Sequence, residues 1–155
     1  MTDMRMGTTA AGSINAARLL AGFVAGFLAV LIFYQLTLAL LYMVGVTPRA
    51  PYSMTAVPPF GVPSFLSGAF WGGLWGVVFA LIEPRFPRGA KYWIAAFLFG
   101  AVVLTVVVWF IVLPIKGQPI GGGWKAAGMV TAFLINGAWG VGTGLILNAI
   151  GRRFG

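Results

Sequence analysis

Three amide side chains lie inside long apolar stretches of the sequence. Gln35 is in the middle of the first stretch, and Asn136 and Asn148 are in the last one. An amide in an apolar helix either bonds across a helix contact, at about 1 kcal/mol or less, or lines a path for a polar solute. Because there are only three such amides, the favoured interpretation is bonding across helix contacts, with a polar path as the alternative.

The side chains that most enzymes and metal sites require are scarce. The 155 residues include no His and no Cys, and the acidic residues are Asp3 and Glu83. The commonest general base, metal ligands and haem ligands are therefore missing, and the sequence has no phosphate-binding Gly-rich signature. We predict no enzymatic activity, no cofactor and no metal. For Glu83, which stands beside Arg85 and Arg88 in the sequence, we predict a local charge pair.

Small residues recur at every fourth position in two of the apolar stretches. One stretch contains Gly68, Gly72 and Gly76, and the other contains Gly140 and Gly144. This spacing places residues on one face of a helix, where missing side chains let two backbones approach closely. We predict that these five glycines are helix-packing positions, facing a helix of this chain or of a partner.

The same two stretches resemble each other. Residues 65–86 align with residues 133–154 at an offset of 68, and eight of the 22 aligned positions are identical. The first and third stretches match more weakly, with Ala21, Phe23 and Gly26 corresponding to Ala95, Phe97 and Gly100. We predict a tandem, parallel repeat of two helical hairpins, related by an axis along the membrane normal. The alternative is convergence on a shared Trp-Gly packing pattern.

Composition and apolar length predict the class of protein. Hydrophobic residues make up 60% of the chain and charged residues 8%, against about 25% charged in a soluble domain. We predict an all-α, polytopic membrane protein that forms a single domain, residues 1–155, because four apolar runs are long enough to cross a bilayer. After a tail at 1–18, the expected helices span about 19–46, 62–82, 92–115 and 126–150.

The basic residues predict orientation. Seven fall on one side of the predicted membrane and three on the other: Arg5, Arg18, Arg85, Arg88, Lys91, Arg152 and Arg153 against Arg49, Lys116 and Lys125. The positive-inside rule then places both termini in the cytoplasm and the chain in the inner membrane. The net charge of +8 lies in short segments between apolar runs, so it predicts contact with anionic lipid on the cytoplasmic side and no nucleic-acid partner.

Two classes of function fit these patterns, with a third as a minor alternative. The first is a non-catalytic scaffold or accessory subunit that uses its glycine faces to pack against itself or a larger membrane complex. The second is a small channel or transporter for an uncharged or weakly polar solute, with its path near Gln35, Asn136 and Asn148. The third is a lipid- or pigment-binding protein, because aromatic clusters such as Phe70, Trp71 and Trp75 can hold such a ligand.

Overall fold

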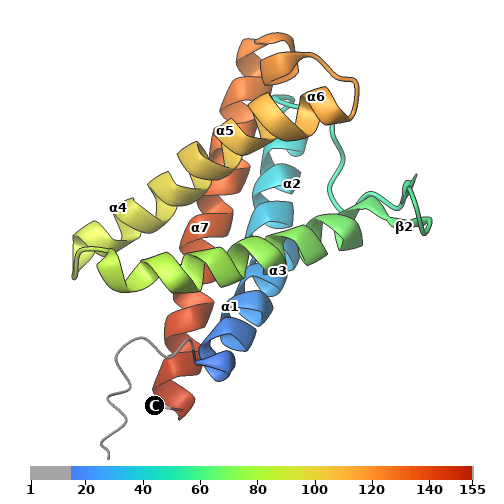
Figure 1. Ribbon diagram of the computed structural model, residues 1–155. Helices are drawn as coiled ribbons and strands as arrows, with labels where there is room; N and C mark the ends of the chain where they lie inside the picture. The colour runs from blue at the N-terminus through green and yellow to red at the C-terminus, as the bar shows by residue number, and fades with distance from the viewer. Residues whose placement is uncertain (1–14, 155) are drawn as a thin grey trace, which may run out of the picture.

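The computed structural model describes residues 15–154, with side chains described up to residue 152 (Figure 1). Most of the predicted tail, residues 1–14, lies outside this range, as does residue 155. Within it, four helices are long and apolar enough to cross a membrane. The predicted all-α, polytopic membrane fold is therefore confirmed.

The first span is one continuous helix of 28 residues, Ala16–Met43. It consists of α1 (Ala16–Ala29), a π-helical turn η1 (Val30–Tyr34) and α2 (Gln35–Met43). Asn15 caps its start by accepting a hydrogen bond from the Ala17 amide, 3.0 Å away. The helix is about 42 Å long, so it must tilt across a hydrocarbon core of about 30 Å or project beyond it.

A proline-rich loop and a small hairpin connect the first two spans. The strands β1 (Ala56–Val57) and β2 (Val62–Pro63) pair antiparallel, with Gly61 at φ +69° in the turn. The second span follows directly as α3 (Ser64–Ile82), extended by a 3₁₀ turn, η2 (Glu83–Arg85).

The third and fourth spans flank a glycine-rich link. The third runs from Ala90 to Ile115 without a break, although its hydrogen bonding alternates between α-helical and π-helical turns. Its parts are α4 (Ala90–Leu98), η3 (Phe99–Leu104), α5 (Thr105–Val107), η4 (Val108–Val112) and α6 (Leu113–Ile115). The link contains η5 (Ile120–Gly123), and the fourth span is α7 (Ala126–Phe154).

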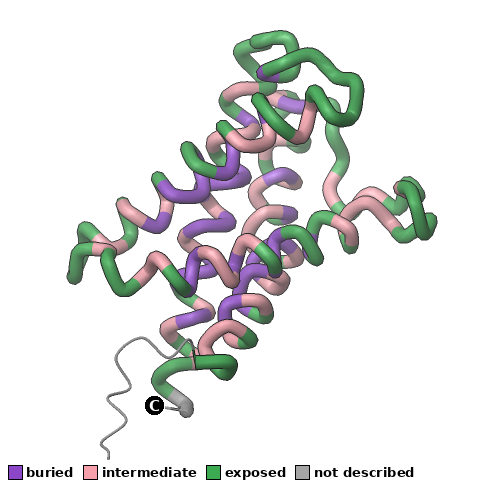
Figure 2. The backbone as a smooth tube through the Cα atoms, viewed as in Figure 1, coloured by how far each residue is buried: buried purple, intermediate pink, exposed green. Residues whose placement is uncertain are grey.

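The helices are arranged around an antiparallel pair formed by the first and fourth spans. In Figure 1, α1 and α7 run side by side in opposite directions, α3 lies across α1, and the third span crosses α7. Buried residues gather where the helices cross, whereas loops and helix ends are exposed (Figure 2).

Glycines form the contact between the first two spans. A Cβ built on Gly76 would clash with the carbonyl oxygen of Gly22, and one built on Gly26 would clash with that of Gly72. The ring of Phe23 fills the space beside Gly73, 2.6 Å from where its Cβ would be. The two backbones are therefore close enough that only glycine fits between them.

The third and fourth spans make corresponding contacts. A Cβ on Gly140 would clash with the Ala96 carbonyl, one on Gly100 with the Asn136 carbonyl, and one on Gly137 with the ring of Phe97. These contacts can be compared with those between the first and second spans. Each residue of the third span takes the place of the first-span residue 74 positions before it, as Phe97 does for Phe23, and this is the predicted offset.

The second and fourth spans, however, correspond at an offset of 64, one helical turn less than the predicted 68. The contacts thus match Gly76 with Gly140 and not Gly72 with Gly140. At this offset both helices carry the pattern Gly-x-Trp-Gly-Val-x-x-x-Leu-Ile, in residues 73–82 and 137–146.

The two hairpins are joined through the ring of Trp139. This side chain is 1% exposed, and its indole Nε1 donates a hydrogen bond to the carbonyl of Gly26, 3.0 Å away. Phe79 and Phe99 pack around it, with ring centroids 6.1 and 6.5 Å from that of Trp139. A buried indole needs an acceptor, and the side-chain-free surface of α1 provides one.

Candidate functional site

Polar side chains converge at one end of the bundle. We call this the basic end: it contains the start of α1, the connection from α3 to α4, and the end of α7. Its described cationic residues are Arg18, Arg85, Arg88, Lys91 and Arg152. The opposite end contains Arg49, Lys116 and Lys125.

Arg18 connects the first span to the second. Its guanidinium pairs with the Glu83 carboxylate, and its Nε donates to the carbonyl of Ala80 at 3.0 Å. The residue four positions after Ala80 is Pro84, which has no N–H, so this carbonyl lacks its usual helical donor. Arg18 supplies the missing bond and at the same time places a cation at the C-terminal end of α3.

Glu83 therefore pairs across helices. The predicted local pair with Arg85 and Arg88 is wrong in its partner, because Arg18 approaches the carboxylate from the neighbouring span. With a side chain 12% exposed, Glu83 is more buried than a surface carboxylate, so this pair is screened less than a surface pair.

Tyr92 and Asn148 extend the network to the other two spans. The Tyr92 hydroxyl donates to Glu83 Oε1 at 2.8 Å, and Asn148 Nδ2 donates to the Tyr92 oxygen at 3.0 Å. Asn148 Nδ2 also lies 2.8 Å from the Gly144 carbonyl. Gly144 makes room for the hydroxyl, since a Cβ there would lie 2.9 Å from it. Arg18, Glu83, Tyr92 and Asn148 thus join all four spans, and we call them the four-span network.

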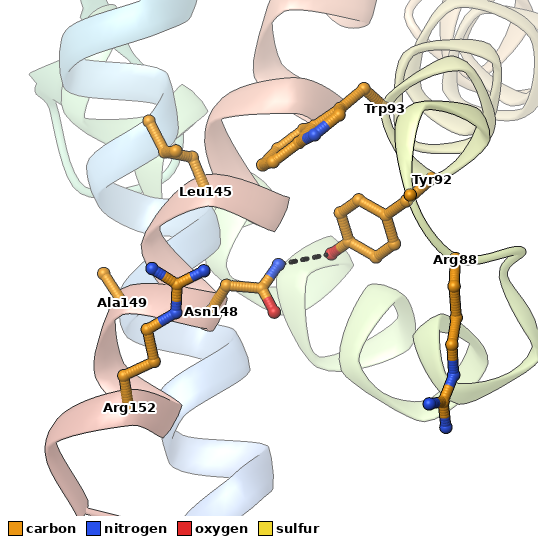
Figure 3. Close-up of a pocket in the computed structure, with 8 residues that line it drawn as sticks. Arg88, Tyr92, Trp93, Leu145, Asn148, Ala149 and Arg152 are labelled. Atoms are coloured by element: carbon orange, nitrogen blue, oxygen red, sulfur yellow. Dashed lines mark hydrogen bonds between the residues drawn. The ribbon is translucent and has the colours of Figure 1, made fainter.

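A cavity of about 400 Å³ opens beside this network, between α4 and α7 (Figure 3). Its lining consists of Arg88, Gly89, Tyr92, Trp93, Leu145, Asn148, Ala149 and Arg152. Figure 3 shows the Arg152 guanidinium directed back along α7 toward Asn148, whereas Arg88 extends away from it. Two of the lining residues are cationic and none is acidic.

The other predicted amides lie elsewhere and are bonded. Gln35 is 4% exposed and accepts a hydrogen bond from the Tyr52 amide at 2.8 Å, while the Tyr52 hydroxyl donates to the Leu31 carbonyl at 2.6 Å. Asn136 donates to Thr105 Oγ1 at 2.9 Å. Asn136 and Asn148 are twelve residues apart, or about 18 Å along α7. The structure therefore assigns each of the three amides to a different contact.

Four of the five predicted packing glycines lie in close contacts. Gly72 and Gly76 face α1, Gly140 faces Ala96, and Gly144 faces Tyr92. Gly68 is exposed, and a Cβ there would only just reach Val30, at 4.0 Å. The stripe in α3 thus makes its tight contacts at its second and third glycines and is loose at its first.

The described buried polar side chains all have partners. Within the part of the chain with described side chains, no buried nitrogen or oxygen lacks a hydrogen bond, and no group of three His, Cys, Asp or Glu residues could hold a metal ion. The aromatic clusters pack on neighbouring rings, as Trp75 does on Phe99 and Trp109 on Trp124.

Sequence reasoning missed Arg18 and Tyr92 as partners of Glu83. A signal was present, since helices that alternate in direction place residue 18, residues 83–92 and residue 148 at the same end. Comparison with known proteins adds no further assignment, because no family model, curated protein or solved structure matches the chain.

Proposed function

We propose that this protein is a non-catalytic scaffold or accessory subunit of the inner (plasma) membrane, with both termini in the cytoplasm. The orientation is supported by the distribution of charge: five of the eight described cationic side chains are at the basic end. The positive-inside rule places that end in the cytoplasm.

The observation that carries the proposal is the difference between the two faces of α3. The inner face uses Gly72 and Gly76 against α1, so these glycines are no longer available to a partner. The outer face is a stripe of exposed apolar residues with an aromatic centre: Leu66, Phe70, Trp71, Leu74 and Leu81. We propose this outer stripe as the surface through which α3 meets another subunit, in place of the predicted glycine face.

The channel alternative has less support. It requires Gln35, Asn136 and Asn148 to share one path, and each of them is bonded to a different part of the chain. Bonding across a helix contact is thus the role of Asn136 and Asn148, whereas Gln35 bonds to Tyr52 in the loop and not to another helix.

Photo-cross-linking in native membranes tests the proposal. A photo-reactive amino acid at Trp71, on the outer stripe of α3, is compared with one at Ile111, which is 54% exposed on the third span. A scaffold should give a discrete protein adduct at position 71 and lipid adducts at position 111, and native mass spectrometry should detect the same partner, or a second copy, at fixed stoichiometry.

Two results would overturn the proposal. One is a monomer that yields lipid adducts at both positions. The other is solute flux through proteoliposomes of the purified chain that is lost on Asn136→Leu, which would establish the channel function.

A further inference from the structure

The cavity between α4 and α7 combines a cationic rim with an apolar wall. Arg88 and Arg152 provide the positive charge, and Trp93 and Leu145 provide apolar surface that is 38% and 47% exposed. Glu83, the nearest acid in the network, is engaged by Arg18 and Tyr92 and does not contribute to the lining. The electrostatic preference of the cavity is therefore for an anion.

Asn148 adds polar specificity at the inner side of the cavity. Its Nδ2 group donates to Tyr92 and to the Gly144 carbonyl. An amide has two donor hydrogens, and these two bonds use both, so the side chain turns its oxygen toward other partners. In Figure 3 this oxygen points away from Tyr92 toward the space between the helices. This oxygen can accept a hydrogen bond from a hydroxyl or ammonium group of a ligand in the cavity.

The surroundings of the cavity favour a lipid over a free ion. It lies at the end of two membrane-spanning helices, where headgroups are found. On α7, the face with Leu145 continues at helical spacing through Val141 and Ala138 to the exposed Leu134. A volume of about 400 Å³ falls in the range for organic ligands and is larger than one phosphate requires.

We propose that this cavity binds the phosphate headgroup of an anionic membrane phospholipid, with Arg152 on the phosphate, Arg88 adding positive charge at the rim, and the acyl chains along the outer face of α7. Basic pockets between transmembrane helices are suited to such headgroups. Trp93 lies near the start of the third span, Ala90–Ile115, and aromatic rings are enriched at the ends of spans, at the level of the headgroups. The site is independent of the scaffold function, because it uses α4 and α7 and not the outer stripe of α3.

Native mass spectrometry of the detergent-solubilised full chain tests this site. The protein is titrated with phosphatidylglycerol or with phosphatidylcholine, and the same titrations are run on Arg152→Gln, Arg88→Gln and the double variant. Arg85→Gln removes the same charge from an exposed position of η2 outside the cavity, and serves as the matched control.

The expected result is tighter binding of phosphatidylglycerol than of phosphatidylcholine, weakened about fivefold by each cavity variant. Arg85→Gln should bind like the unmodified chain, and millimolar inorganic phosphate should not displace the lipid. Thermal unfolding of each variant confirms that binding is compared between folded proteins.

Three outcomes would overturn the proposal. A double variant that binds phosphatidylglycerol normally would show that the arginines do not hold it. An equal loss in Arg85→Gln would show a diffuse charge effect. Displacement by inorganic phosphate at the same concentration as by lipid would make this a small-anion site.

Discussion

Trp139 and Gly26 are 113 residues apart in the chain, yet the indole of one donates to the carbonyl of the other at 3.0 Å. The bond is possible because Gly26 has no side chain to cover its carbonyl. It connects the first hairpin to the second inside a region where water cannot replace a lost partner.

Trp139→Phe should therefore lower the thermal stability of the protein in detergent. The substitution leaves the Gly26 carbonyl without its indole donor, at a cost of about 1 kcal/mol, and also opens a small cavity. Trp75→Phe is the matched control, since Trp75 is only half-buried and packs edge-to-face against Phe99. If the Trp75 variant were destabilised as much as the Trp139 variant, the hydrogen bond from Trp139 to Gly26 would not explain the loss of stability.

Glycine substitutions should divide into two groups. Gly76→Ala and Gly140→Ala each place a Cβ against a backbone carbonyl of the neighbouring span, which cannot move aside like a side chain. We expect both to lower the unfolding temperature clearly in the same detergent. Gly128→Ala on α7 meets nothing within 4 Å, and Gly68→Ala meets only Val30 at 4.0 Å.

These two controls should be neutral or slightly stabilising, because alanine favours a helix over glycine by about 0.5–1 kcal/mol. If the Gly76 and Gly140 variants unfolded at the same temperature as the controls, the close approach of the helices described above would be incorrect.

The partner of Glu83 can be identified by double-mutant cycles. Arg18→Gln and Glu83→Gln should show a coupling of about 1 kcal/mol in unfolding free energy, because each single change disrupts the same pair. The corresponding cycle with Arg85→Gln should be additive. Coupling to Arg85 without coupling to Arg18 would restore the local pair that the sequence predicted.

Gln35 should hold the first loop against the bundle. Gln35→Leu removes the acceptor for the Tyr52 amide, so the loop should open and trypsin should cut faster at the exposed Arg49. Asn136→Leu removes a bond to Thr105 elsewhere in the chain and should leave the cleavage rate unchanged. If trypsin cut Gln35→Leu and the unmodified chain at Arg49 at the same rate, Gln35 would not be what holds the loop in place.

The proposed topology predicts the behaviour of reporter fusions. Ala56 lies in the hairpin at the end opposite the basic end, and Gly89 lies in the connection between α3 and α4. An alkaline phosphatase fusion at Ala56 should be active outside the cytoplasm, and a fluorescent fusion at Gly89 should be active inside it. A cytoplasmic signal at Ala56 would reverse the orientation.

The four spans were predictable because each is a long apolar run, and the hydrophobic effect acts on each segment independently of its neighbours. The helix register was not. The second span contains two Trp-Gly steps one turn apart, Trp71-Gly72 and Trp75-Gly76, so the second and fourth spans can be aligned at an offset of 68 or of 64. The contacts between helices distinguish the two offsets: Gly76 lies against Gly22 as Gly140 lies against Ala96, which corresponds to an offset of 64.

The polar partners were less predictable still. Nothing near Gln35 in the sequence indicates that Tyr52 returns to it after a proline-rich loop, because that bond depends on the folded path of the loop. For Glu83, the nearest arginines in sequence were the wrong guide, since Arg18 reaches it from another helix. The sequence thus predicts that an amide or carboxylate in an apolar helix is hydrogen-bonded, but it does not predict which residue is the partner.

The four-span network also implies an order of assembly during synthesis. Its members occur along the chain as Arg18, Glu83, Tyr92 and Asn148, one for each successive span, and each bonds to the member before it. A chain made from its N-terminus can therefore pair Glu83 as soon as the second span is in place, add Tyr92 with the third, and close with Asn148. The carboxylate already has its counter-ion before the later helices arrive, so no stage of synthesis needs to leave it unpaired in the bilayer.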